Sequence, residues 1–557
     1  MNKRPWWKTA VVYEIYCKSF CDSDGDGIGD LRGVISKLET LRDLGINCIW
    51  FTPLYVSPQV DNGYDVADYR AIDPIFGSME DFKELLDRAH SMGIRIIMDM
   101  VLNHSSDLHP WFQESRKSRD NPYRDYYIWK APREDGSEPN NWGNYFEEGN
   151  GSAWTFDETT GEYYFHQYSS KMPDLNWECK ALREEIYEML NEWLDLGVDG
   201  FRLDVITRLK KMPGLPDSTL PPVPGKEPFV IDKNMCCMVD GIHDYLQELN
   251  QRVFSRPDCM TVGEGSGLRS WNVMDYVHRD RKELDMVYHF ELAHLMRHQI
   301  PNALYTDVQT RWAEVVRGGG WCVQYLSNHD IGRQVSTYGE DGTFRIPSAK
   351  LLATLIHTTP GTPFIFQGEE IGMTNVHYDS IEDHNCLATL ARYDKLIGQG
   401  MEPKEALLAT EKVSRDNART PYQWNGGENA GFTAGKPWLK VNSRAGEINL
   451  EKDLASDDSI FRYYRKLCDM RKEHPAIVEG DLRFYGEDEQ VLCYTRSCKE
   501  ETLLILANKS SSSAEFSLPT ELKGKKGVLL LSNLSPDVLL QENMHLSPWE
   551  AVVFSIQ

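Results

Sequence analysis

The sequence predicts an α/β fold, a (β/α)8 TIM barrel with a small domain inserted after the third strand and an antiparallel β-sandwich at the carboxyl end. Eight runs rich in β-branched and aromatic residues lie between residues 11 and 366, and amphipathic stretches such as 30–45 and 79–93 separate them. From about residue 481, closely spaced short strands replace this alternation. Strands that alternate with helices are typical of parallel α/β sheets, and eight such units favour a barrel over a doubly wound sheet.

The barrel strands are expected at short apolar runs between the helical stretches. They are predicted at residues 11–16, 47–52, 95–102, 198–203, 260–263, 284–290, 322–326 and 363–366. The segment 105–178 is too long for an ordinary loop and predicts the inserted domain. The barrel then comprises residues 1–104 and 179–480, and the C-terminal sandwich comprises residues 481–557.

The composition argues against several kinds of partner. A net charge of −25, from 60 basic and 85 acidic residues, argues against nucleic acid or an anionic membrane and suits neutral ligands. The 12 cysteines lack metal-ligand spacing and are interpreted as reduced thiols. No apolar leader opens the chain and no run of about eighteen apolar residues occurs, so we expect a cytoplasmic protein. We further expect a monomer or a weak homo-oligomer, without an organic cofactor.

Polar residues gather at the carboxyl ends of the predicted strands, where barrel enzymes place their active sites. They are Asp99, Asn103 and His104 on the third strand, Arg202 and Asp204 on the fourth, Glu264 on the fifth, and His329 and Asp330 on the seventh. Several carboxylates and basic groups therefore converge on one rim. Taken singly, any of these residues could equally form a structural ion pair.

Cleavage of a glycosidic bond needs such a set, because one carboxylate must be ionised while another carries a proton. Arg202 and Asp204 lie two residues apart on a strand, so their side chains share a face, and the guanidinium favours an ionised Asp204. Glu264, beside negative neighbours, should have a raised pKa and hold its proton. Asp330 remains to bind sugar hydroxyls and to favour the oxocarbenium-like transition state.

Five motifs carry a family resemblance, in the order YDVADY (64–69), DMVLNH (99–104), GFRLDVI (200–206), VGE (262–264) and SNHD (327–330). They resemble the signature regions of the α-amylase superfamily, glycoside hydrolase family 13. The match is closest to its oligo-1,6-glucosidase and dextran-glucosidase branch, through SFCDSDGDGIGDLRGV (19–34), PNNWG (139–143), PDLNW (173–177) and RDNARTPYQW (415–424). The resemblance covers nearly the whole chain. It implies Asp204 as nucleophile, Glu264 as acid/base and Asp330 as transition-state stabiliser, with retained anomeric configuration and the first two carboxyl groups about 5 Å apart.

The same resemblance implies a pocket for one terminal glucose, and release of glucose from the non-reducing end of short α-glucosides. The residues expected around the sugar are Asp61, Tyr64, His104, Arg202, His329 and Arg415. Tyr64 would stack under the ring, although on its own it would be interpreted as a core tyrosine. Asp61 and Arg415 would clamp the 4-hydroxyl and leave no room for a further sugar, while the two histidines would donate to hydroxyls.

The residue after the nucleophile bears on the linkage that is cut. In this branch Val tends to accompany α-1,6 cleavage, so Val205 favours isomaltose, isomalto-oligosaccharides and panose. Three departures from the branch's common residues, on the expected leaving-group side, leave sucrose or maltose open as substrate. They are Met172, Gly265–Ser266 and Ile331–Gly332.

Other functions compete with this interpretation. A sucrose isomerase would carry an Arg/Asp-rich loop after SNHD, where this chain reads IGRQVSTYGEDG. A trehalose-6-phosphate hydrolase would need a basic pocket for the phosphate. Arg269 and Arg279 are the candidates for such a pocket and support it only weakly. A non-catalytic relative, like the heavy chains of amino-acid transporters, would have a membrane span, and some of these lack the catalytic carboxylates. All three carboxylates are present here.

The segment DSDGDGIGD (22–30) predicts a cation site. Carboxylates at Asp22, Asp24, Asp26 and Asp30 alternate with glycines, and oxygen ligands on a Gly-bent loop suit Ca²⁺, with the Ile28 carbonyl as a backbone ligand. The flanking helices and terminal Glu of an EF-hand are missing, and a solvated acidic turn is the alternative. The resemblance implies a structural Ca²⁺ or Mg²⁺ here, away from catalysis.

Overall fold

The centre of the molecule is an eight-stranded parallel sheet in the order β11-β10-β9-β5-β2-β1-β13-β12. The computed structural model describes residues 5–146, 151–222, 227–292, 301–486 and 488–557. A parallel bridge between Val287 and Cys322 joins the two ends of the sheet, which closes it into a barrel. The barrel strands are β1 (Val12–Ile15), β2 (Cys48–Phe51), β5 (Arg95–Val101), β9 (Gly200–Asp204), β10 (Met260–Glu264), β11 (Met286–Tyr288), β12 (Val323–Gln324) and β13 (Thr362–Phe366).

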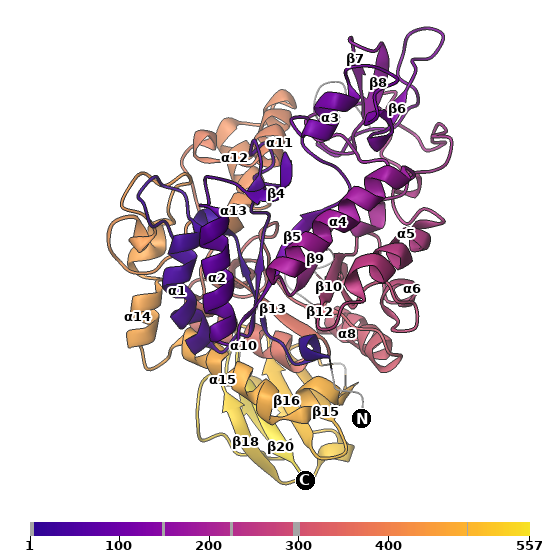
Figure 1. Ribbon diagram of the computed structural model, residues 1–557. Coiled ribbons are helices and arrows are strands. Elements are labelled where there is room, and N and C mark those ends of the chain that lie inside the picture. Colours follow the sequence, from indigo (N-terminus) through magenta and orange to yellow (C-terminus); the bar gives the residue numbers. More distant parts are fainter. Residues whose placement is uncertain (1–4, 147–150, 223–226, 293–300, 487) are drawn as a thin grey trace.

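Helices cover the outside of the barrel (Figure 1). The strands are buried along nearly their whole length, because one face fills the barrel and the other meets the helices. The main covering helices are α1 (Leu31–Leu44), α2 (Met79–Ser91), α4 (Lys180–Leu196), α5 (Ile242–Leu249), α6 (Met274–Val277), α8 (Asn302–Arg317), α10 (Arg345–Thr358) and α15 (Ile460–Glu473). Shorter helices are α9 (Gln334–Thr337), α14 (Leu450–Ala455) and α16 (Pro475–Glu479).

Local sequence signals set the ends of the first two helices. α1 begins where the Asp30 carboxylate accepts a hydrogen bond from the amide of Gly33, and it ends at Gly45 in the left-handed conformation. α2 begins with a capping box between Ser78 and Asp81. Both helices lie where the amphipathic pattern predicts them.

Two excursions rise above the carboxyl ends of the barrel strands (Figure 1). The first follows β5 and contains α3 (Pro110–Ser115) and a three-stranded antiparallel sheet of β6 (Trp129–Lys130), β8 (Glu162–Phe165) and β7 (Trp154–Asp157). The second follows β13 and contains α11 (Leu387–Gly398), α12 (Pro403–Glu411) and α13 (Asp416–Arg419). Strands β3 (Tyr55–Val56) and β4 (Asp68–Ile72) pair in the loop after β2.

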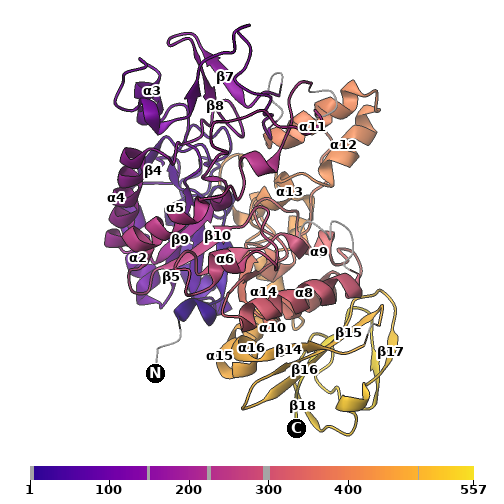
Figure 2. The same ribbon diagram turned by 90° about the vertical axis from the view of Figure 1, so that its right-hand side faces the viewer.

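An antiparallel β-domain lies at the opposite end of the molecule (Figure 2). Its five-stranded sheet, in the order β14-β15-β16-β20-β18, shares an apolar core with the pair β17-β19. These strands are β14 (Asp481–Phe484), β15 (Val491–Ser497), β16 (Thr502–Asn508), β17 (Ala514–Ser517), β18 (Gly527–Ser532), β19 (Asn543–Leu546) and β20 (Ala551–Ile556). The buried Arg496 of β15 donates to the carbonyl of Thr358 in α10 at 2.7 Å, which ties this domain to the barrel.

The predicted fold class is confirmed, with each barrel strand found at its predicted place and the extra sheets after the third strand and at the carboxyl end. In the described residues, no helix has both the length and the apolar character that crossing a bilayer requires. All twelve cysteines are free thiols.

Candidate active site

Arg202 lies at the centre of a carboxylate cluster at the carboxyl ends of three neighbouring barrel strands. Its Nη1 donates to Oδ1 of Asp99 on β5 at 2.9 Å and to Oδ1 of Asp204 on β9 at 2.6 Å. Its Nη2 donates to Oε2 of Glu264 on β10 at 2.8 Å. The backbone amide of Val205 donates to the same Glu264 oxygen at 3.1 Å. One buried guanidinium therefore fixes three carboxyl groups, including the predicted nucleophile and acid.

The two predicted catalytic carboxyl groups bind the same guanidinium but differ in their surroundings. Burial raises the pKa of Glu264 to about 7; Arg202 opposes this rise, and the negative charge of Asp204 reinforces it. Burial also raises the pKa of Asp204 to about 6, although the positive charge of Arg202 lowers it. Because the pKa of Glu264 is the higher of the two, the proton is favoured on Glu264 and the negative charge on Asp204.

Asp330 lies beside two arginines that come from the second excursion. Nη1 of Arg415 is 3.2 Å from Oδ1 of Asp330, and Nη2 of Arg419 is 2.7 Å from the same oxygen. Burial alone would raise the pKa of Asp330, but the two arginines hold it well below its usual range. Asp330 therefore presents a fixed negative charge to the pocket.

The three predicted catalytic carboxyl groups face one small cavity of about 160 Å³. Pockets for drug-sized ligands span roughly 300–1,000 Å³, so this cavity suits a single sugar ring. Asp61 and Arg415 form an ion pair of 3.1 Å in its wall. The lining residues are Asp61, Tyr64, His104, Phe146, Tyr168, Met172, Asp204, Val205, Glu264, Asp330 and Arg415.

Of the residues predicted around the sugar, Arg202 and His329 lie outside this lining. Nδ1 of His329 is 2.6 Å from Oε1 of Glu14, and its Nε2 is 2.7 Å from the hydroxyl of Tyr64. The rings of Tyr64 and His329 are stacked with their centroids 5.4 Å apart. Burial lowers the pKa of His329 to about 3, so the imidazole is neutral. His329 therefore positions Tyr64, whose side chain lines the cavity.

His104 contributes a neutral imidazole to the cavity wall. Its Nδ1 lies 3.2 Å from Nδ2 of Asn103, which can only donate. Burial lowers the pKa of His104 to about 4. Because Nδ1 accepts, Nε2 carries the proton, and this atom has no partner among the described residues. His104 can thus donate to a sugar hydroxyl.

The residues expected to set the leaving-group preference fall into two groups. Met172 and Val205 line the cavity, whereas Gly265–Ser266 and Ile331–Gly332 lie outside its described lining. Val205 has a φ of 35°, which is rare for a β-branched residue and fixes its side chain directly beside Asp204. Of these positions, Met172 and Val205 are therefore the ones within reach of a sugar in the cavity.

Sequence reasoning missed Glu14, Arg419, Phe146 and Tyr168, and it placed Asp99 on the rim without giving it a role. Glu14 is a charged residue within an apolar strand, so it carried a usable signal. Arg419 lies one helical turn after Arg415 and faces the same way. Phe146 and Tyr168 belong to the inserted segment, where no periodic pattern points to the cavity.

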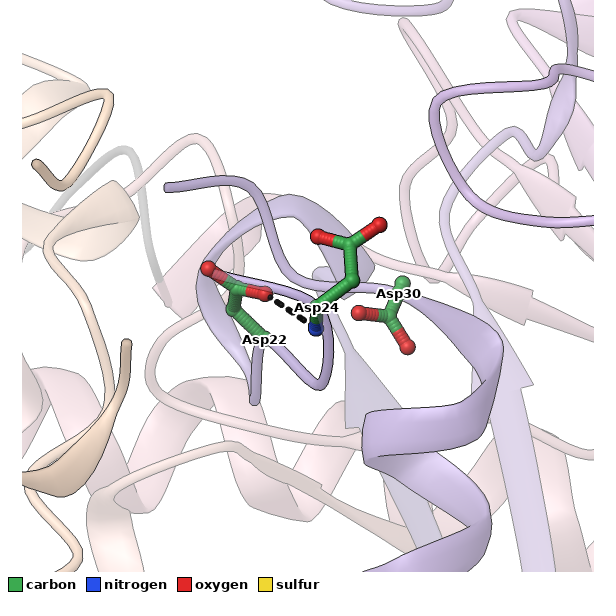
Figure 3. Close-up of side chains that lie close together, drawn as sticks. All are labelled: Asp22, Asp24 and Asp30. Atoms are coloured by element: carbon green, nitrogen blue, oxygen red, sulfur yellow. Dashed lines mark hydrogen bonds between the residues drawn. The ribbon is translucent and has the colours of Figure 1, made fainter. Parts of the chain in front are cut away.

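The predicted cation loop brings three of its residues together (Figure 3). Carboxylate oxygens of Asp22, Asp24 and Asp30 lie within 4.8 Å of one another, and Asp26 is not part of this described cluster. Oδ1 of Asp26 instead accepts the amide hydrogen of Ile28 at 2.8 Å. Three converging carboxylates on a Gly-bent loop fit a hard divalent cation such as Ca²⁺ or Mg²⁺.

This loop also packs against a segment from the far end of the second excursion. The amide of Asp22 donates to the carbonyl of Phe432 at 2.9 Å, and the amide of Trp438 donates to the carbonyl of Gly27 at 3.0 Å. A Cβ at Gly27 would lie 1.9 Å from the carbonyl oxygen of Lys436, and φ is +96°, so only glycine fits. The loop and residues 432–438 therefore hold each other in place.

Comparisons with known proteins agree with this geometry. Residues 14–480 match the alpha amylase catalytic domain, and residues 482–553 match the C-terminal domain of maltogenic amylase. The chain is 46% identical, over 568 residues and 100% of both chains, to an oligo-1,6-glucosidase of Parageobacillus thermoglucosidasius. Among solved structures it is similar to the trehalose-6-phosphate hydrolase of Bacillus licheniformis, with a TM-score of 0.92, 42% identity and coverage of 99% of this chain and 100% of that one.

It is also similar to the trehalulose synthase of Pseudomonas mesoacidophila MX-45, with a TM-score of 0.92, 39% identity and coverage of 100% of both chains. The catalytic-domain match spans most of the chain and all the motifs that carry the carboxylates. The chain is a glycoside hydrolase and belongs to the α-amylase family.

Proposed function

We propose that this enzyme is a retaining α-glucosidase that releases single glucose units from the non-reducing end of short α-1,6-linked glucosides such as isomaltose. The observation that carries the proposal is that Arg202 holds Asp204 and Glu264 together at a small cavity whose wall contains the ion pair of Asp61 and Arg415. Inverting enzymes separate their carboxyl groups by roughly 6.5–9.5 Å to admit a water, whereas retaining enzymes keep them about 5–5.5 Å apart. Two carboxyl groups that bind the two terminal nitrogens of one guanidinium lie close together, which supports the retaining class.

The reaction proceeds in two steps. Asp204 attacks the anomeric carbon while Glu264 gives its proton to the glycosidic oxygen, so the bond to the leaving group breaks as an ester to Asp204 forms. Glu264, now a carboxylate, then takes a proton from a water that attacks the same carbon and releases Asp204. Two inversions at this carbon restore the α configuration. Asp330, held ionised by its arginines, stabilises the positive charge that develops on the ring in both steps.

The preference for α-1,6 linkages is supported by Val205 and by similarity to a protein named oligo-1,6-glucosidase. Cleavage of a phosphorylated disaccharide has less support. Arg415 is the only Lys or Arg in the described cavity lining, and its guanidinium is already ion-paired with Asp61 and Asp330. Arg269 donates to the carbonyl of Leu268, and the side chain of Arg279 is 84% exposed beside Asp280. Neither arginine lines the described cavity.

The proposal includes a structural Ca²⁺ or Mg²⁺ held by Asp22, Asp24 and Asp30. Such an ion would compensate three carboxylate charges and stiffen the loop that packs against residues 432–438. None of these carboxylates lines the catalytic cavity, so the ion would supply no chemistry to the reaction. We also propose a cytoplasmic location, in keeping with free thiols throughout the chain.

The decisive experiment is glucose release by the purified enzyme from isomaltose, maltose and sucrose at equal concentration. We expect isomaltose to be cleaved fastest, with α-glucose as the first product detected by NMR. Faster cleavage of maltose or sucrose would refute the linkage preference, and β-glucose as the first product would refute the retaining mechanism.

A further inference from the structure

Arg415, in the wall of the catalytic cavity, is held at three points. Its Nη1 is 3.2 Å from Asp330 and its Nη2 is 3.1 Å from Asp61. Its third nitrogen, Nε, donates to Sγ of Cys386 at 3.2 Å. The two carboxylates bind the terminal nitrogens Nη1 and Nη2, and the thiol binds Nε. All three together set the plane of the group.

Cys386 is itself fixed relative to Arg415 by the polypeptide backbone. The carboxylate of Asp416, the next residue after Arg415, accepts hydrogen bonds from the amides of Asn385 at 2.9 Å and Cys386 at 3.1 Å. The same carboxylate lies 3.2 Å from Nδ1 of His384. The thiol is buried, with 1% of the residue exposed. The start of α11 and the turn that carries Arg415 therefore behave as one unit.

A second cavity adjoins Arg415. It has a volume of about 340 Å³ and is lined largely by α11 and the turn before α13, with Cys386 and Arg415 in its wall. Phe146 and Arg415 line both cavities, and the guanidinium carbon of Arg415 lies 5.8 Å from the centre of the Phe146 ring. These two side chains therefore form a partition between the cavities. If Nε of Arg415 lost its hydrogen-bond partner, the guanidinium could turn into the larger cavity.

We propose that Cys386 is a positioning residue that holds Arg415 in this partition and keeps the catalytic cavity closed behind a single sugar. The inference rests on the proposed function, because it takes the cavity as the site of the terminal glucose. A thiol is a weak hydrogen-bond acceptor, so its role is to orient the guanidinium that the two carboxylates already bind. Without the thiol, Arg415 can still form both ion pairs, but the plane of its guanidinium is no longer fixed.

The test is a double-mutant cycle of Cys386→Ala and Arg415→Ala, read by kinetics on 4-nitrophenyl α-glucoside and by calorimetric binding of glucose. Cys386→Ala should raise KM and the Kd of glucose by about three- to tenfold, with a smaller change in kcat, because the lost contact orients bound sugar before and during reaction. Cys386→Ser keeps an acceptor and should recover most of the loss. In the presence of Arg415→Ala, the change at Cys386 should have no further effect.

A matched control is Cys493→Ala, which removes another buried thiol from strand β15 and should leave KM at the parent value. Equal losses from Cys386→Ala with and without Arg415→Ala would make Cys386 a general structural residue and overturn the proposal. So would parental KM and glucose affinity in Cys386→Ala. If the parent binds glucose but does not hydrolyse isomaltose, the linkage assignment fails. The double-mutant cycle measured by glucose binding still decides the role of Cys386.

Discussion

Glu264 and Asp204 are bound by the same guanidinium: Nη2 of Arg202 donates to Glu264 at 2.8 Å and Nη1 donates to Asp204 at 2.6 Å. The higher pKa of Glu264 favours a protonated Glu264 beside an ionised Asp204, which are the states that acid and nucleophile need before the first step. Because the two groups lie together and share one cation, their titrations are coupled. The pH dependence of the enzyme should therefore report on the pair.

We expect a bell-shaped dependence of kcat/KM on pH. Asp204 must be ionised, and burial raises its pKa, so the acid limb should lie above the value of about 3.9 for an ordinary aspartate. Glu264 must be protonated, and its pKa is raised to about 7, so activity should fall as the pH rises through about 7. Initial rates across the pH range, with isomaltose at low concentration, give the profile.

Glu264→Gln serves as the control for this assignment. It should remove the alkaline limb and lower kcat for isomaltose by about 10²–10⁴-fold, because the amide cannot donate the catalytic proton. An alkaline limb that persists in this variant would mean that another group titrates.

Asp204→Asn should reduce glucose release on the order of 10⁴-fold, since an amide cannot form the covalent intermediate. The fold should survive, because Arg202 keeps its bonds to Asp99 and Glu264. Turnover and a thermal melt check the two parts separately. Activity above about one tenth of the parent's, with an unchanged melt, would contradict the assignment of the nucleophile.

Val205→Thr should shift the linkage preference. Val205 lines the cavity beside the nucleophile, so a hydroxyl in place of a methyl changes the surface that meets the sugar. We expect the ratio of kcat/KM for isomaltose over maltose to fall by about tenfold, the size of change typical of a single group in a pocket. Ile206→Val, at a fully buried neighbour outside the cavity lining, should leave the ratio unchanged. A constant ratio in Val205→Thr would show that this residue does not select the linkage.

Removal of divalent cations with a chelator should lower the melting temperature while leaving kcat at moderate temperature nearly unchanged. An ion present at 100 times its Kd stabilises the folded state by about 2.7 kcal/mol, and the carboxylates that would bind it lie outside the catalytic cavity. Differential scanning calorimetry and initial rates with and without chelator measure both quantities.

Two variants separate an ion from a merely acidic turn. Asp24→Asn should lower the melting temperature and make it insensitive to chelator, whereas Asp26→Asn, outside the cluster, should keep the parent's response. Identical behaviour of the two variants would refute the site. Loss of turnover before loss of stability would instead make the ion catalytic.

The sequence was informative wherever the signal was local. Barrel strands were predicted because each is a short apolar run, and Asp204 and Glu264 were found because each stands at the end of such a run. The pKa of Asp204 was harder to predict. The sequence shows the neighbouring Arg202, which lowers this pKa, but not the burial, which raises it by more. The bonds from Arg415 and Arg419 to Asp330 cross 85 and 89 residues, and the bond from Arg415 to Cys386 crosses 29. Such contacts depend on how the second excursion folds back, and no periodic pattern encodes that.

The contact between the loop 22–30 and residues 432–438 bears on when the enzyme becomes active during its synthesis. The hydroxyl of Thr433 donates to the carboxylate of Asp22, a contact across 411 residues. Contacts this distant form late, because the intervening chain must first be ordered. A nascent chain extending just past β10 already contains Asp204 and Glu264, yet Arg415 and Arg419 are still untranslated. The growing polypeptide therefore carries its reactive carboxylates long before it can enclose a sugar, and hydrolysis begins only when most of the chain has left the ribosome.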